Sequence, residues 1–157
     1  MRFLLSYTYH FVVSNSRHGT HSPFVYALAE KVIYNPSFKS ASYVDMPDGL
    51  TGKFMPLLRN ILAFWKLDRL SADVEDQTAP AYWVDAPSIS EESILQHLHR
   101  GKVVFLHKPY ARKHRSLWRN LIADERVVVS INLFYFGILI HRSGQRKEDF
   151  LLRYPGI

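Results

Sequence analysis

The sequence RVVVSINLFYFGILIHR, residues 126–142, is the longest nearly uninterrupted apolar stretch of the chain. Most of its residues are β-branched or aromatic, the types that fit a pleated, buried surface. A strand that is covered on both faces has such a continuous apolar pattern in place of an alternation. The stretch therefore predicts a central strand over 127–133 and a second strand over 135–142, in which Gly137 relaxes a bend or a close approach.

The residues after this stretch predict how the sheet ends. The segment SGQRKE at 143–148 is polar and contains a glycine, which suits a hairpin loop. The segment DFLLRY at 149–154 then supplies the returning strand.

Upstream of the stretch, strands are predicted to alternate with helices. AYWVD at 81–85 and KVVFL at 102–106 indicate strands. Ser88 and Glu91 have the spacing of a capping box and open a helix that ends at Gly101. A further helix is predicted over 110–122. The alternation is typical of a parallel α/β sheet closed by an antiparallel hairpin, with both helices on one face because crossovers are right-handed.

The N-terminal part of the chain predicts helices for the other face. Ser22 is a good N-cap and Pro23 suits the first helical position, and the helix ends at Asn35-Pro36. A second helix is predicted over 54–65, after a loop over 36–53. Residues 69–74 form a weak strand candidate. Residues 3–13 fit either the alternation of a strand or one face of a helix.

Composition narrows the classes of protein. A chain of 157 residues is typical of one domain, and the absence of cysteine excludes disulfides, thiolate metal sites and a cysteine nucleophile. No apolar run reaches the roughly 20 residues that span a bilayer, and no signal-peptide cleavage pattern follows the N-terminal apolar residues. We therefore expect a cytoplasmic protein with no membrane partner. The net charge of +6 favours loose association with polyanions.

The segment RHGTHSPFVY at 17–26 resembles the HG-x-HSPFV-[YF] signature near the N-terminus of a group of bacterial class I S-adenosylmethionine-dependent methyltransferase-like proteins. Parts of the C-terminal half are similar to the same group, including KEDFLLR at 147–153. The resemblance implies an α/β fold with a truncated Rossmann-like, methyltransferase-type sheet, mostly parallel, with a C-terminal antiparallel hairpin and N-terminal helices. It favours a helix over 3–13. It also implies an N-terminal helical segment and loop (1–53) packed on a shortened core (54–157) within a single domain.

The chain departs from that family at the cofactor site. Such a fold holds its cofactor on a glycine-rich turn after the first strand, where backbone amides and a helix start approach the ligand. Here residues 75–80 contain no glycine, about two helix–strand units are missing, and His107-Lys108 replaces an acidic pair. We therefore expect a non-catalytic binding or assembly module with no cofactor and no metal. Lost sheet units leave strand edges that need a cover, which predicts a homodimer.

Three groups of side chains are candidates for chemistry or binding. Asp85 and His107 end neighbouring strands and form a possible base with its orienting partner, although a structural contact is the favoured reading. His18 and His21 flank Gly19 before a helix start; they fit an anion or metal site, or more simply fix the start of that helix. The densest basic cluster is a possible phosphate-binding face, although a solvated surface is favoured, and it includes Lys108, Arg112, Arg115 and Arg119.

Two other functions stay open. One is an S-adenosylmethionine-dependent methyltransferase with an atypical cofactor pocket. The other is a basic domain that binds nucleic acid, which the charge allows but the absence of interleaved aromatic residues in the basic cluster does not favour.

Overall fold

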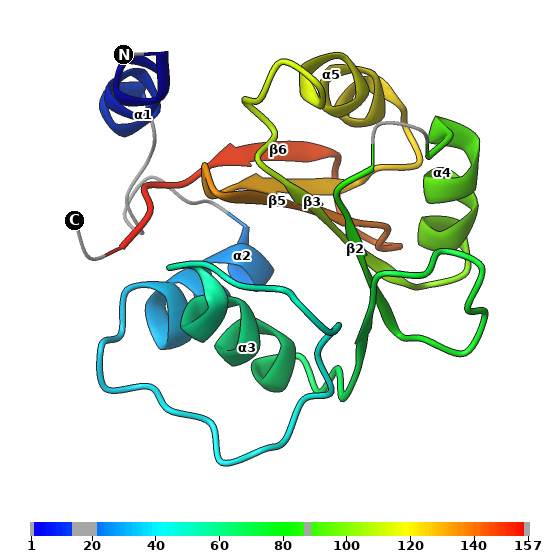
Figure 1. Ribbon diagram of the computed structural model, residues 1–157, viewed down its shortest axis with the longest axis horizontal. Helices are drawn as coiled ribbons and strands as arrows, with labels where there is room; N and C mark the ends of the chain where they lie inside the picture. Colours follow the sequence, from blue (N-terminus) through cyan, green and yellow to red (C-terminus); the bar gives the residue numbers. More distant parts are fainter. Residues whose placement is uncertain (1, 14–21, 87–88, 156–157) are drawn as a thin grey trace.

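The computed structural model describes residues 2–13, 22–86 and 89–155, which form a mixed sheet with helices on both faces (Figure 1). The helices are α1 (Arg2–Val13), α2 (Pro23–Leu28) with its π-helical continuation η2 (Ala29–Ile33), α3 (Met55–Phe64), α4 (Glu91–His99) and α5 (Arg115–Ala123). The strands are β1 (Leu70–Ser71), β2 (Ala81–Val84), β3 (Val103–His107), β4 (Val129–Asn132), β5 (Phe136–Ile140) and β6 (Glu148–Leu151). The protein is thus an α/β protein, as predicted.

The strand order of the sheet is β1-β2-β3-β5-β4-β6. β1, β2 and β3 are parallel, whereas β5 is antiparallel to both of its neighbours, β3 and β4. The apolar stretch therefore contributes two adjacent strands, and β5 is the more central of them. The predicted strand over 127–133 is confirmed as an interior strand, because β4 has β5 on one side and β6 on the other.

The predicted hairpin at 143–148 is wrong. β6 pairs in parallel with β4 and not with β5. The tight antiparallel connection is instead the turn between β4 and β5, where Phe134 has a positive φ of 69° and its amide donates to Oδ1 of Asn132. Because this turn already places β5 on one side of β4, residues 141–147 carry the chain across to the free side of β4.

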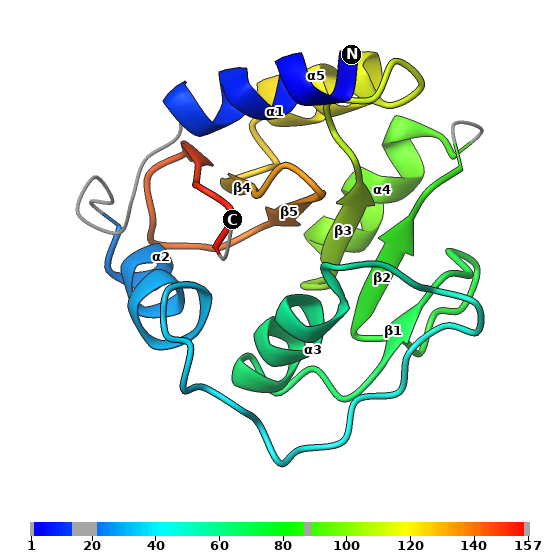
Figure 2. The same ribbon diagram turned by 60° about the vertical axis from the view of Figure 1, so that its left-hand side comes forward.

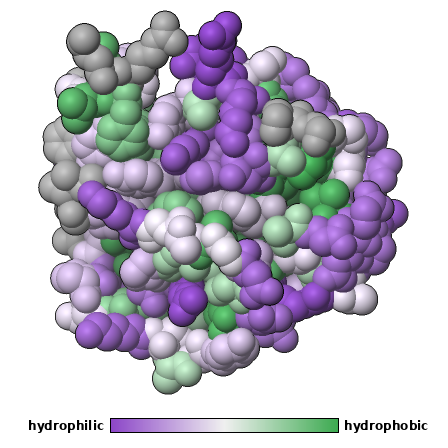
Figure 3. Space-filling model, in the orientation of Figure 1, coloured by the Kyte–Doolittle hydropathy of each residue, from purple (hydrophilic) through white to green (hydrophobic). Residues whose placement is uncertain are grey.

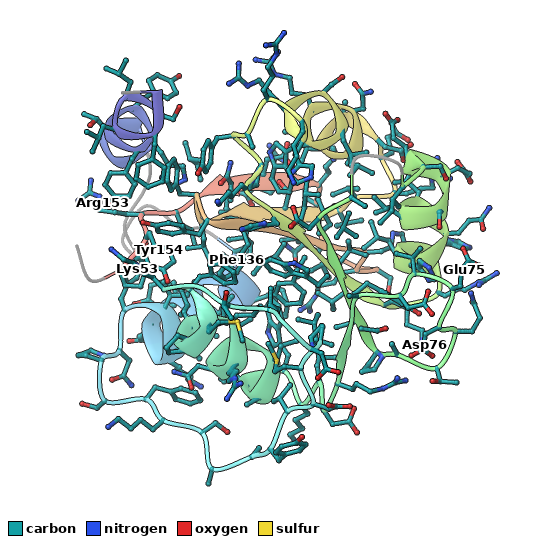
Figure 4. The ribbon with its side chains drawn as sticks, in the orientation of Figure 1. Lys53, Glu75, Asp76, Phe136, Arg153 and Tyr154 are labelled. Atoms are coloured by element: carbon teal, nitrogen blue, oxygen red, sulfur yellow. The ribbon has the colours of Figure 1, made fainter. Side chains whose placement is uncertain are left out.

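The helices cover the sheet as the crossover rule predicts. α4 and α5 pack on one face, with Leu95, Leu98 and Leu121 in one apolar cluster with the side chains of β2 and β3. α2, η2 and α3 pack on the other face around Trp83 and Phe105. Phe136 lies in the interior of the molecule between the sheet and α3 (Figure 4).

Most of the predicted helices are confirmed, with differences at their ends. Residues 3–13 lie in a helix, and Ser22 caps α2 by accepting from the amide of Val25. The cap of α4 is Ser90, whose Oγ accepts from the amide of Ser93, whereas the predicted cap Ser88 lies outside the described residues. The helix predicted from 110 begins only at Arg115, because residues 108–114 form turns after β3.

Two connections shape the edge of the sheet at β1. Asp45 pairs with Arg69 in an isolated parallel bridge, so residues from the loop over 36–53 cover the outer side of β1. The chain then passes from β1 to β2 through residues 72–80 without a helix, although parallel strands are usually joined by a longer, helical crossover. Among the described residues, none of the helices has the length and apolar character needed to cross a bilayer.

Candidate functional site at the ends of β2 and β3

The predicted pair of Asp85 and His107 lies at the carboxyl ends of two neighbouring parallel strands. Val84 and Leu106 are register partners, so Asp85 and His107, the residues that follow them, lie side by side. Nδ1 of His107 is 3.1 Å from Oδ1 of Asp85, although the two groups do not meet in hydrogen-bond geometry. The structure therefore brings this pair together, in the place where open α/β sheets position functional groups.

Two residues from the turn before α5 complete the cluster. Nζ of Lys113 donates to Oδ1 of Asp85 over 2.9 Å. Nε2 of His114, whose side chain is fully buried, lies 3.2 Å from the backbone oxygen of Asp85. The carboxylate of Asp85 is thus contacted from β3 and from the turn, which ties the end of β2 to the start of α5.

The electrostatics of the pair follow from burial and contact. Burial lowers the pKa of His107 more than the contact with Asp85 raises it, and the charge of Lys108 lowers it further. Partial burial opposes ionisation of Asp85, but the hydrogen bond from Lys113 and the contact with His107 outweigh it, so the pKa of Asp85 is below its ordinary value. At neutral pH the pair is an ionised carboxylate beside a neutral imidazole.

A neutral imidazole beside a carboxylate has the protonation state of a general base, but its position here is unsuited to that work. Both ring nitrogens of His107 are buried and have no hydrogen-bond partner among the described residues. The ring packs against Trp83 and Phe54, at centroid distances of 5.2 and 5.5 Å. A base must reach the proton that it removes, so the geometry favours a structural contact over catalysis.

The loop after β1 lies where the resemblance predicts the cofactor cradle, and its polar groups bond to the protein itself. Asp76 accepts from Arg69 and from Thr78, whose hydrogen bonds lower the pKa of Asp76 to about 2. The hydroxyl of Tyr82 donates to the backbone oxygen of Asp76, and Nε2 of His97 lies 2.7 Å from the backbone oxygen of Val74. The labels Glu75 and Asp76 mark this loop at the right-hand side of Figure 4.

The other predicted residues do not join this cluster as a set. Lys108, at φ 44°, turns the chain out of β3, and its amide donates to the backbone oxygen of Tyr135. Arg115 and Arg119 lie on α5. The predicted helix over 110–122 included Arg112, but Arg112 lies in the turn before α5. His18 and His21 lie outside the described residues. No group of three or more His, Asp or Glu side chains that could hold a metal ion occurs in the described part of the chain.

Sequence reasoning missed the roles of three residues. The hydrogen bond from Lys113 to Asp85 and the contact of the buried His114 with the backbone oxygen of Asp85 were not predicted. His97 was not among the predicted site residues, yet it is buried, and its ring lies tilted against that of Tyr82 with 4.1 Å between the ring centroids. The available signal was the short connection after β3, which must fold back over the end of the neighbouring strand to start α5 on the same face.

Comparisons with known proteins add no relative to this picture: a scan against protein-family models finds no match, and neither does a search of curated proteins or of solved structures.

Proposed function

We propose that the protein is a non-catalytic, methyltransferase-like domain that acts as a binding or assembly module and does not hold S-adenosylmethionine. The observation that carries the proposal is the connection between β1 and β2. It consists of residues 72–80 and contains no helix. It bonds to its flanks through Arg69 and Tyr82 and to α4 through His97. A nucleoside cradle needs free backbone amides and a helix start in this position.

The strand order supports the same proposal. In a doubly wound sheet the first strand is internal, and the ligand crevice lies where the strand order reverses beside it. Here β1 is followed in space by β2 and then β3, and the outer side of β1 meets only the segment around Asp45 in the described structure. An antiparallel strand, β5, then enters the sheet after β3, whereas the predicted hairpin at 143–148 does not form, because β6 pairs in parallel with β4.

The experiment is isothermal titration of the protein with S-adenosylmethionine and, separately, with S-adenosylhomocysteine. We expect no saturable heat at micromolar ligand and no rise in melting temperature, because a ligand that binds only the folded state must stabilise it. Saturable micromolar binding of either compound would overturn the proposal. It would favour the alternative, a methyltransferase with an atypical pocket.

A further inference from the structure

Helix α1 exposes an apolar face. The side chains of Leu4 and Leu5 are each 65% exposed and that of Tyr9 is 70% exposed. The opposite side of the helix holds it to the protein, since Tyr7 and His10 pack edge-on against the buried ring of Phe134. α1 lies across one end of the molecule (Figure 2), and Figure 1 shows the segment that leads from β3 into α5 between α1 and α5. The exposed apolar side chains therefore lie on the outer side of α1, whose inner side is already packed against the protein.

Exposed arginines lie next to these apolar side chains. Arg112, Arg115 and Arg119 are all exposed. Arg112 and Arg119 make no ion pair or hydrogen bond among the described residues, and Arg115 donates only to the backbone oxygen of Tyr110. Figure 3 shows the apolar surface of α1 beside a strongly hydrophilic cluster at the top of the molecule. We call these six residues, Leu4, Leu5, Tyr9, Arg112, Arg115 and Arg119, the α1–α5 face.

Open grooves connect the two parts of the α1–α5 face. One of about 680 Å³ is lined by Phe3 and Leu5 on the α1 side and by Arg112 and Arg115 on the other. A second, of about 320 Å³, brings Tyr9 together with Arg115 and Arg119. Among the described residues, no carboxylate lines either groove. Each groove thus combines an apolar wall with a cationic rim.

We propose that the α1–α5 face docks on the surface of an anionic phospholipid bilayer. In such a contact the leucines and Tyr9 enter the boundary between headgroups and acyl chains, and the arginines meet lipid phosphates. An anionic lipid matches both parts of the α1–α5 face, since it offers a negative headgroup for the arginines directly above an apolar chain for the leucines and Tyr9. The expectation of no membrane partner rested on the absence of a spanning segment, and peripheral docking needs none.

Other occupants fit this face less well. A symmetric contact with a second copy places the same patch against itself, so the unpaired arginines would oppose one another. A nucleic acid would satisfy the arginines, but it would leave Leu4 and Leu5 against water or phosphate. The combination of exposed leucines and unpaired arginines therefore favours a lipid surface.

The test is cosedimentation of the protein with phosphatidylcholine vesicles that contain or lack phosphatidylglycerol. We expect binding only to the anionic vesicles, with loss at high salt because screening weakens surface attraction. The double variant Leu4→Ser/Leu5→Ser should weaken binding at least about tenfold, since each leucine loses its apolar burial. Arg112→Gln/Arg119→Gln should weaken it by a similar factor, since each arginine near an anionic surface contributes about 1 kcal/mol, roughly fivefold.

The matched control is Lys31→Gln/Lys39→Gln, which removes the same charge from exposed positions of η2 and the following loop. It should retain binding, and circular dichroism should show that all variants stay folded. Absence of binding to anionic vesicles at low salt would overturn the proposal. So would binding that Leu4→Ser/Leu5→Ser leaves unchanged, or equally tight binding to duplex DNA, because either result assigns the face to a polyanion. None of these outcomes bears on the titration with S-adenosylmethionine.

Discussion

Gly137 in β5 is the residue on which the packing of α5 depends most directly. A Cβ built on Gly137 would lie 2.3 Å from Cζ3 of Trp118, a distance that no real contact allows. Trp118 is buried and cannot simply swing into solvent. We expect Gly137→Ala to lower the free energy of unfolding by about 1–3 kcal/mol, the usual range for overpacking a core. Denaturant unfolding monitored by fluorescence measures this loss.

A second substitution shows whether the clash is the cause. Trp118→Phe replaces the indole by a smaller phenyl ring, which lacks the outer atoms Cζ3 and Cη2 that lie closest to Gly137. In the Trp118→Phe background, Gly137→Ala should therefore cost less, with a coupling of at least about 0.5 kcal/mol. If the two substitutions are simply additive, the close approach does not explain the need for glycine.

His107 makes stability depend on pH. Burial holds the pKa of His107 below its ordinary value of 6.5. At pH values between the lowered pKa of the folded protein and the ordinary pKa of the unfolded chain, the unfolded chain binds a proton that the folded protein does not. The free energy of unfolding therefore falls as pH drops below about 6.5. Asp85, whose pKa is lowered from 3.8, acts in a separate and more acidic window.

His107→Phe tests this dependence, because phenylalanine retains an aromatic ring between Trp83 and Phe54 but does not titrate. We expect the variant to lose less stability than the wild type between pH 7 and pH 5, as measured by denaturant unfolding at each pH. His10, whose pKa burial also lowers, contributes equally to both proteins. Identical pH profiles would show that His107 is not the source of the dependence.

At the scale of elements, the loop over 72–80 is held by a few specific bonds. The hydroxyl of Tyr82 donates to the backbone oxygen of Asp76 from a fully buried ring. We expect Tyr82→Phe to cost about 1 kcal/mol, the usual net value of one such hydrogen bond. Amide hydrogen exchange should accelerate more in 72–80 than in β3 and β5, where it rises by no more than the roughly fivefold that corresponds to the loss of global stability.

Tyr43→Phe is the matched control, because Tyr43 is 83% exposed. It makes the same chemical change without removing a buried bond, so stability and exchange should not move. Equal effects of the two substitutions would mean that the bond to Asp76 does not hold the loop.

The elements differ in how far sequence alone predicted them. The cap of α2 and the periodicity of α2 and α3 placed both helices well, because these signals are local. The pairing of β6 with β4 was missed, since a polar segment such as 143–148 serves a hairpin or a longer crossing equally well. The pair of Asp85 and His107 was predicted from the ends of two parallel strands. The contacts of Lys113 and His114 were not, because they depend on the path of a turn.

At the scale of the whole molecule, the two edges of the sheet differ. The edge at β1 is covered by the bridge between Asp45 and Arg69. The edge at β6 pairs with β4 alone among the described strands. An uncovered strand edge is a template for pairing with another chain. If the predicted homodimer forms through a strand, β6 is therefore the better candidate.

The homodimer prediction can be tested at that edge. The amides of Glu148 and Leu152 donate inward to the backbone oxygens of Val128 and Asn132. Because amides alternate along a strand, the amide of Leu151 points to the open edge, where Leu151→Pro removes a donor without breaking the pairing with β4. We expect light scattering at micromolar concentration to give a dimer for the wild type and a monomer for Leu151→Pro. The melting temperature of the wild type alone should rise with protein concentration, since association stabilises the folded state. A monomeric wild type would contradict the homodimer, and a dimeric Leu151→Pro variant would move the contact away from β6.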